Sequence, residues 1–140
     1  MVEVVAALIA HPEQKERYLV ARRATGEARA NRWEFPGGKI QEGESHTAAL
    51  ARELKEELDV GAQIGPLYLL TAHEYDDVHI RLWTYLATIQ GEPQTGPGHS
   101  ALDWMTADEM LDVEFSAADL PVVRAVRAQS SVFRQFQIFD

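Results

Sequence analysis

The stretch from Gly38 to Val60, GKIQEGESHTAALARELKEELDV, constrains this chain more than any other part of its sequence. Its second half lacks Gly and Pro and repeats leucine every fourth residue, which predicts an amphipathic helix that Ser45 can cap. Six carboxylates fall within the stretch, and only Arg52 and Lys55 oppose them in the helical half. Like charges on neighbouring turns destabilise a helix by about 0.2–0.5 kcal/mol per pair. Their concentration here therefore indicates a functional role.

Three of these carboxylates, Glu53, Glu56 and Glu57, share one stripe of the predicted helix, because residues three and four apart are neighbours on a helical surface. Glu57 also falls beside Leu50 and Leu54, so the acidic stripe borders the buried one and should lie at a cleft edge. A half-buried carboxylate cluster needs a cation, and oxygen ligands suit a hard ion such as Mg²⁺. The alternative is a solvated acidic helix, the usual state of a charge run.

A proline and two glycines precede the helix, in the segment Phe35-Pro36-Gly37-Gly38. Glycine permits tight turns and a close approach of the backbone to a ligand. This segment can therefore bring backbone oxygens to a bound ion.

The register of the acidic stretch resembles the Nudix box of the Nudix hydrolases. That box reads glycine, five residues, Glu, seven residues, Arg-Glu-apolar, one residue, Glu-Glu, one residue and Gly-apolar. Eight of its nine specified positions match, namely Gly38, Glu44, Arg52, Glu53, Leu54, Glu56, Glu57 and Val60. The departure is Asp59, where the family has a glycine that ends the helix in the left-handed conformation. Asp adopts this conformation less readily than Gly, so we expect local strain with function retained.

Residues 2–128 as a whole resemble the MutT branch of these hydrolases and its bacterial CTP pyrophosphohydrolase relatives. Outside the box the likeness rests on Val4-Val5-Ala6-Ala7, Ala21-Arg22-Arg23, Trp33 to Lys39, His79-Ile80, Leu82-Trp83, Trp104, Ala118-Asp119 and Pro121. It implies an α+β fold, a Nudix-type α/β/α sandwich with a mixed β-sheet, in a single domain over residues 1–140 with the box at 38–60. It also implies hydrolysis of nucleoside triphosphates, such as 8-oxo-dGTP or modified CTP and dCTP, to the monophosphate and pyrophosphate.

The same resemblance implies roles for single residues. Mg²⁺ or Mn²⁺ is expected on Glu53, Glu56, Glu57 and the Gly37 carbonyl, and Arg52 and Glu44 complete the expected catalytic set by orienting a carboxylate and supporting the loop. The expected substrate contacts are Arg23, Phe35, Gly38, Lys39, Tyr75 and Asp119. From the residues alone, an arginine that leaves a strand is more often solvated, although a guanidinium suits phosphate oxygens. Phe35 fits the core as well as it fits stacking on a base.

Asp119 bears on the choice of base. An ionised carboxylate only accepts hydrogen bonds, which suits the amino group of cytosine. It could also accept from the N1–H and amino group of an oxidised guanine, so both bases stay open. The alternative is that Asp119 only caps the final helix, because Asp119-Leu120-Pro121 fits a cap with Pro in the first turn.

One position departs from the family pattern near the last strand. The family usually places a further acid six residues before the tryptophan of that strand, where this chain has Gly98 followed by His99. We therefore expect an incomplete metal shell, with Glu92 and His99 as weak substitutes and His99 on a loop surface. This departure leaves open a nucleotide-binding module with weakened catalysis. A Nudix hydrolase of another nucleoside diphosphate derivative is the third possibility.

Apolar runs and turn residues predict the remaining elements. Strands are expected at 2–10, 18–22, 67–74, 78–89 and 102–105, with the third and fourth forming an antiparallel pair. Thr106 opens a capping box before a short helix. The tail at 132–139 is apolar and is expected to pack on the domain or on a second subunit, so a monomer and a homodimer both remain possible.

Composition narrows the classes of partner and compartment. The 140 residues carry a formal net charge of −9, which argues against a general nucleic-acid or anionic-membrane binder. Cysteine is absent, which excludes disulfides and zinc-thiolate sites and is compatible with the expected cytoplasmic location. The apolar run at 4–10 is too short to span a bilayer. The expected partner is thus a nucleoside triphosphate rather than a nucleic acid or a membrane.

Overall fold

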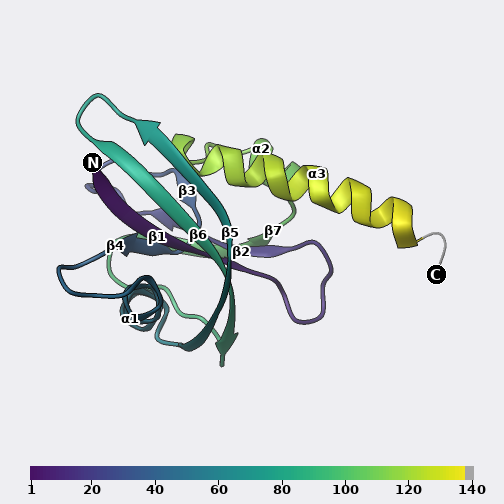
Figure 1. Cartoon of the computed structure of the whole chain (residues 1–140), viewed down its shortest axis with the longest axis horizontal. Helices are drawn as coiled ribbons and strands as arrows, with labels where there is room; N and C mark the ends of the chain where they lie inside the picture. The colour runs from purple at the N-terminus through teal and green to yellow at the C-terminus, as the bar shows by residue number, and fades with distance from the viewer. Residues whose placement is uncertain (138–140) are drawn as a thin grey trace.

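The computed structural model describes residues 1–137, with side chains described as far as residue 129, and contains two β-sheets (Figure 1). The four-stranded sheet has the order β4-β1-β6-β5, formed by β4 (Gly37–Lys39), β1 (Val2–Ile9), β6 (His79–Gln90) and β5 (Gly61–Glu74). The three-stranded sheet has the order β3-β2-β7, formed by β3 (Trp33–Glu34), β2 (Tyr18–Arg23) and β7 (His99–Met105). Strands β1 and β6 are parallel and the other pairs are antiparallel, so the mixed sheet is confirmed.

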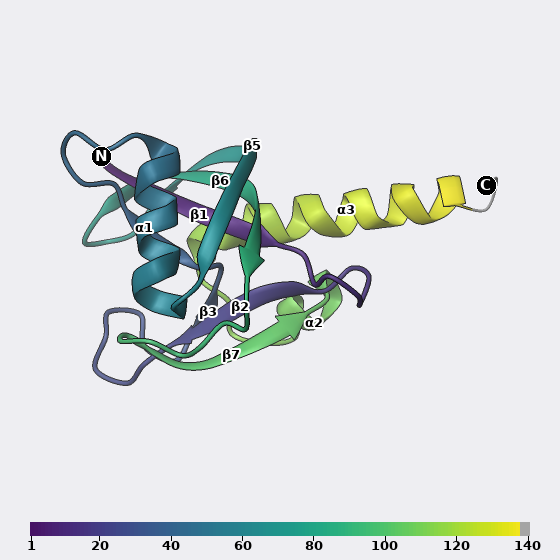
Figure 2. The ribbon, with the colours of Figure 1, turned by 90° about the horizontal axis from the view of Figure 1, so that it is seen from below.

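Helices cover both faces of this arrangement, as Figure 2 shows for α1 (His46–Leu58) and α3 (Leu120–Gln137). The apolar run of β1 explains why. Val5, Ala7 and Ile9 pack with the buried face of α1, whereas Ala6 and Leu8 pack with the side of α3. Successive side chains of a strand point to opposite faces, so a continuous apolar run is buried on both. The α/β/α sandwich expected from the sequence is therefore confirmed.

The helix of the acidic stretch begins and ends as its sequence predicts. Ser45 caps it, since its Oγ accepts a hydrogen bond of 3.1 Å from the Ala48 amide. Asp59 ends it in the left-handed conformation at φ 55°, ψ 43°, and its amide donates to the Lys55 carbonyl. Lys55 Nζ also lies 3.0 Å from Asp59 Oδ1. An aspartate thus occupies a backbone conformation that glycine adopts at lower cost.

Two strands begin earlier than predicted. Strand β5 starts at Gly61 rather than at residue 67, and its pairing with β6 shifts register between Ile64 and Leu67, where Pro66 interrupts the ladder. Strand β7 starts at His99 rather than at residue 102, directly after the positive φ of 85° at Gly98. The early start of β7 matters for the site, because it places His99 in a strand rather than in the predicted loop.

The C-terminal elements follow the two β-sheets. The capping box of Thr106 and Glu109 opens α2 (Ala107–Leu111), as predicted. A 3₁₀ turn, η1 (Ala117–Asp119), leads into α3, which has Pro121 in its first turn. The side chains of the tail at 132–139 lie outside the described residues. No helix in the described part of the chain is long and apolar enough to cross a membrane.

Candidate active site

Two glycines at the start of the acidic stretch lie close to their neighbours, Gly37 to the backbone of β1 and Gly38 to the carboxylate of Glu53 in α1. A Cβ on Gly38 would lie 2.6 Å from Glu53 Oε1, and a Cβ on Gly37 would collide with the Val5 carbonyl oxygen. Both glycines belong to β4, which pairs with β1. The absence of a side chain at Gly37 therefore lets β4 approach β1, and its absence at Gly38 lets the carboxylate of Glu53 lie against the backbone of β4.

Arg52 links several acids of the box into one network. Its Nε and Nη2 donate to the two oxygens of Glu44 at 2.7 and 2.8 Å, and Nη1 donates to Glu53 Oε1 at 3.0 Å. Weaker bonds reach Glu56 Oε2 at 3.3 Å and the Lys39 carbonyl at 3.2 Å. Glu44 ties the loop before α1 to the helix, and Arg52 fixes one oxygen of Glu53. This geometry agrees with the orienting and supporting roles predicted for the pair.

The three predicted metal ligands differ in exposure. The side chain of Glu56 is 59% exposed, whereas those of Glu53 and Glu57 are 13% and 21% exposed. Burial raises the pKa of Glu53, although Arg52 opposes this effect. Burial also raises the pKa of Glu57 to about 7, against the opposing charge of His99 and with the reinforcing charge of Glu53. Two partly buried carboxylates thus lie on neighbouring turns of α1: Glu53 forms an ion pair of 3.0 Å with Arg52, and Glu57 has the longer contact of 4.0 Å with His99.

The donor set nevertheless fits a divalent cation. Glu57 Oε2 is buried and has no hydrogen-bond donor among the residues that the structure describes. A buried carboxylate oxygen left in this state is costly unless a cation or a donor reaches it. Within the described residues, no three His, Asp or Glu side chains already converge as a ready metal centre. Oxygen ligands with an unsatisfied lone pair suit a hard cation such as Mg²⁺.

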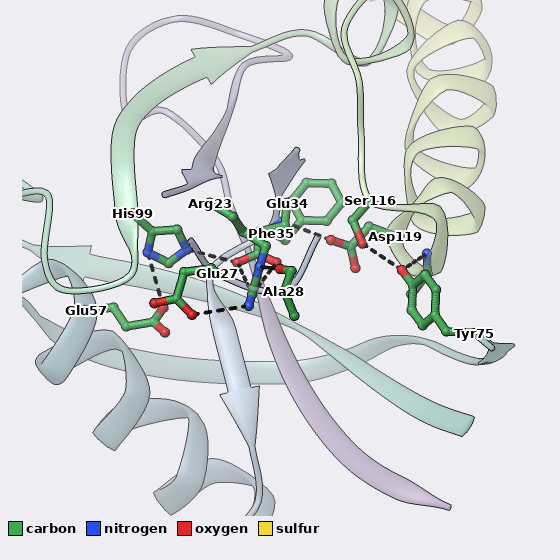
Figure 3. A network of polar contacts seen from close by, with 11 residues as sticks. Arg23, Glu27, Ala28, Glu34, Phe35, Glu57, Tyr75, His99, Ser116 and Asp119 are labelled. Atoms are coloured by element: carbon green, nitrogen blue, oxygen red, sulfur yellow. Dashed lines mark hydrogen bonds and ion pairs between the residues drawn. The ribbon is translucent and has the colours of Figure 1, made fainter. Parts of the chain in front are cut away.

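The expectation that His99 lies on a loop surface is wrong. Its side chain is 3% exposed, with Nε2 at 2.9 Å from Glu34 Oε2 and Nδ1 at 4.0 Å from Glu57 Oε2 (Figure 3). The cause is the early start of β7, which pairs His99 with Arg23 of β2 across a bulge. Burial disfavours the charged ring, but the hydrogen bond to Glu34 and the charge of Glu57 outweigh it, so the pKa of His99 is raised.

All six predicted substrate residues line one cavity of about 500 Å³. They are Arg23, Phe35, Gly38, Lys39, Tyr75 and Asp119. A larger hollow of about 1070 Å³ lies elsewhere, between residues such as Leu8, Tyr18 and Tyr68, and its lining includes no residue of the box. The smaller cavity is the better candidate site, because Gly38 in its wall contacts Glu53.

Arg23 is held at the cavity rather than solvated. Its Nε donates to the Ala28 carbonyl at 2.7 Å, and its Nη1 lies 3.3 Å from both oxygens of Glu34. Figure 3 shows that Glu34 therefore receives Arg23 and His99 on one carboxylate. Sequence reasoning missed Glu34, although it lies within the Trp33-Glu34-Phe35-Pro36 segment that carried part of the resemblance.

Tyr75 connects the β5–β6 turn to the 3₁₀ turn η1. Its hydroxyl accepts a hydrogen bond from the Ala118 amide at 3.0 Å and lies 3.1 Å from Ser116 Oγ (Figure 3). The guanidinium of Arg29 lies 4.0 Å from the centroid of the Tyr75 ring and 2.7 Å from Asp77 Oδ1. Arg29 is thus a third cation in the cavity wall, after Arg23 and Lys39, and sequence reasoning missed it because the loop at 24–32 carries no periodic signal.

Asp119 lies inside the domain rather than at an exposed helix end. The residue is 6% exposed, and its Oδ2 accepts a hydrogen bond of 3.1 Å from the Phe35 amide, so it is more than a helix cap. The ring of Phe35 packs edge to face on Phe115 in the core, with centroids 5.3 Å apart. Burial raises the pKa of Asp119 to about 8, and the charge of Glu34 adds to the effect. Burial thus favours the protonated form of Asp119, whereas the prediction from the sequence used only the ionised form.

Known proteins share this fold. A model of the NUDIX domain matches residues 2–126 of the chain. The chain belongs to the Nudix family. Two relatives from Escherichia coli (strain K12) are each 35% identical to this Nudix protein. The CTP pyrophosphohydrolase aligns over 91% of this chain and 93% of its own length, and the 8-oxo-dGTP diphosphatase over 88% and 95%.

A solved structure agrees with this Nudix assignment. The solution structure of the E. coli ORF135 protein matches with a TM-score of 0.80 and 34% identity, covering 94% of this chain and 92% of that one. Every residue of the site described above falls within the matched range of the Nudix model. Nudix hydrolases generally use a divalent metal.

Proposed function

We propose that this Nudix hydrolase cleaves nucleoside triphosphates to the monophosphate and pyrophosphate, with Mg²⁺ as the physiological metal and Mn²⁺ as a substitute. The observation that carries the proposal is the contact between Glu53 and Gly38, which joins the buried acids of α1 to the cavity lined by Arg23 and Tyr75. A triphosphate needs cationic partners at one end and an aromatic or polar wall for its base at the other. The lining of this one cavity provides both the cationic residues and the aromatic wall.

Glu53, Glu56, Glu57 and the Gly37 carbonyl would hold the metal, which supplies charge neutralisation of the phosphate chain and a more acidic water when bound. Glu53 accepts the proton of the attacking water, because Arg52 and Gly38 fix its carboxylate. Water attacks the β-phosphorus, and the bond from that phosphorus to the oxygen shared with the α-phosphate breaks. The monophosphate leaves with this oxygen, and pyrophosphate carries the oxygen of the water.

The other charged groups have distinct tasks in this proposal. The guanidinium of Arg23 lies on the cavity and binds phosphate oxygens, and Lys39 is another cation in the lining of the same cavity. Arg52 and Glu44 hold the loop before α1 and the carboxylate of Glu53 in position. Tyr75 and the Phe35 backbone form the wall against which the base lies.

A protonated Asp119 can both donate and accept a hydrogen bond, so it recognises a base edge that carries both a donor and an acceptor. Oxidised guanine and modified cytosine each offer such an edge. This agrees with the names of the two relatives, which act on CTP and on 8-oxo-dGTP. We therefore propose damaged or non-canonical nucleotides of these two kinds as substrates, in a cytoplasmic role of cleaning the nucleotide pool.

The test is pyrophosphate release with Mg²⁺ from CTP, dCTP, 5-methyl-dCTP, dGTP and 8-oxo-dGTP. We expect turnover of at least one substrate by the natural chain and its loss in the double variant Glu53→Gln, Glu57→Gln. The matched control is Glu42→Gln, which alters an exposed acid of the same box. Full turnover in the double variant would refute the assignment of these acids. Nucleotide binding without turnover in the natural chain would favour a binding module, and turnover of other nucleoside diphosphate derivatives alone would change the substrate class.

A further inference from the structure

The imidazole of His99 faces the acids of α1 with Nδ1, which has no hydrogen-bond partner in the described part of the chain. Its Nε2 lies 2.9 Å from Glu34 Oε2, whereas Nδ1 is buried and lacks a hydrogen bond. The nearest charged atom to Nδ1 is Glu57 Oε2 at 4.0 Å, which is itself buried and without a donor there. Figure 3 shows these two atoms pointing toward each other. Two unsatisfied polar atoms thus share one small buried space.

The bond to Glu34 determines which nitrogen of the ring is free. An ionised carboxylate only accepts, so the proton of the neutral ring stays on Nε2 and the lone pair is on Nδ1. A histidine that donates one N–H to a carboxylate while its other nitrogen points at an acid has the arrangement found around protein metal ions. A separation of 4.0 Å is too long for a hydrogen bond between Nδ1 and Glu57. Two atoms that bind one cation at about 2.0–2.2 Å each can lie this far apart.

We propose that His99 Nδ1 is a direct ligand of the divalent cation held by Glu57, with Glu34 as the residue that positions the ring. The proposal rests on the metal site of the proposed function and adds a nitrogen to its oxygen ligands. It also assigns a role to the side chain that follows Gly98, where this chain has no acid. An imidazole ligand favours Mn²⁺ or Co²⁺ over Mg²⁺ more than a carboxylate does.

The experiment is pulsed electron paramagnetic resonance of the full chain loaded with Mn²⁺ alone, without nucleotide, in slightly alkaline buffer. A directly bound imidazole produces an electron spin-echo modulation from ¹⁴N. We expect this modulation in the natural chain and its replacement by the ¹⁵N pattern when the histidines are ¹⁵N-labelled. The label makes the result independent of whether any variant folds.

Variants then assign the nitrogen. His99→Gln retains a donor for Glu34 but removes the nitrogen that faces Glu57, so we expect loss of the modulation and about tenfold weaker Mn²⁺ binding. His79→Gln is the matched control, because His79 Nε2 also lies beside a carboxylate, 3.3 Å from Glu74 Oε1, with a side chain that is 58% exposed. We expect His79→Gln to leave the modulation and the affinity unchanged.

The outcomes separate this inference from the proposed function. Absence of ¹⁴N modulation in the natural chain, or its persistence in His99→Gln, would overturn the role of His99 and leave triphosphate hydrolysis untouched. Modulation that disappears in His99→Gln supports the ligand even when no nucleotide is hydrolysed, in which case the proposed function fails alone.

Discussion

The substitution Asp119→Asn tests the burial argument directly. Asparagine keeps the shape of the side chain and an oxygen for the Phe35 amide, but it cannot ionise. Asp119 has a pKa of about 8 in the folded chain and an ordinary value of 3.8 when unfolded. Each pKa unit corresponds to about 1.36 kcal/mol of differential stability between the two protonation states. The largest effect is therefore on the order of 6 kcal/mol.

The direction in which the free energy of unfolding changes with pH follows from the number of protons that each state binds. Between about pH 4 and pH 8 the folded chain keeps the Asp119 proton and the unfolded chain has lost it, so the folded state binds more protons. The free energy of unfolding therefore falls as the pH rises through this window and is independent of this group above it. From pH 5 to pH 8 the contribution is about 4 kcal/mol in the natural chain and zero in Asp119→Asn.

The measurement is urea unfolding of the metal-free proteins at several pH values, with the difference between the natural chain and the variant plotted against pH. Taking the difference cancels the contributions of the other groups that titrate in the same pH range. Asp76→Asn, at an exposed position of the β5–β6 turn, is the control and should follow the natural chain. A difference that stays constant within about 1 kcal/mol from pH 5 to pH 8 would show that Asp119 is ionised throughout, and the reasoning from burial would be wrong.

Three further substitutions test the geometry of the box. Gly38→Ala places a Cβ against the carboxylate of Glu53, so we expect at least tenfold loss of pyrophosphate release with an unchanged circular dichroism spectrum; normal turnover would contradict the fixed position of Glu53. Arg52→Lys cannot bind both oxygens of Glu44, so we expect a loss of about 1–3 kcal/mol in urea unfolding, and no loss would make this network irrelevant to stability. Asp59→Gly removes the strain of a non-glycine residue in the left-handed conformation. The exposed ion pair between Lys55 and Asp59 that is lost contributes little. Thermal unfolding should therefore show a gain in stability of about 0.5–1 kcal/mol, with unchanged turnover. A loss of stability would show that the natural residue is not strained.

Features set by local sequence were predictable here. The leucine repeat, the Ser45 cap and the left-handed Asp59 depend on residues within a few positions, and the structure has all three. The apolar run of β1 predicted burial on both faces because the side chains of a strand alternate. The cavity also gathers the six substrate residues that the family resemblance indicated.

Features set by distant contacts were not predictable from the residues alone. The burial of His99 depends on its pairing with Arg23, far away in the chain, after the turn at Gly98. The protonation of Asp119 depends on the desolvation of its carboxyl, whose hydrogen bond comes from Phe35, 84 residues away. A sequence pattern gives the type of each residue but not the loss of water around it. In both cases long-range packing determines the surroundings of a titratable side chain.

Glu34 explains how the two ends of the site influence each other. Its carboxylate accepts hydrogen bonds from Arg23 and His99, and its negative charge raises the pKa of both Glu57 and Asp119. A cation bound at Glu57 would stabilise the ionised form of that acid, whereas no cation in the described chain makes a hydrogen bond to Asp119, whose donor is the Phe35 amide. Burial is the main cause of the raised pKa of both acids, and the charge of Glu34 adds to the effect at each, so this central carboxylate couples Glu57 to Asp119. In the proposed function a metal ion is the partner of Glu57 and a base is the partner of Asp119, so the charge of Glu34 would act on both halves of the proposed triphosphate site.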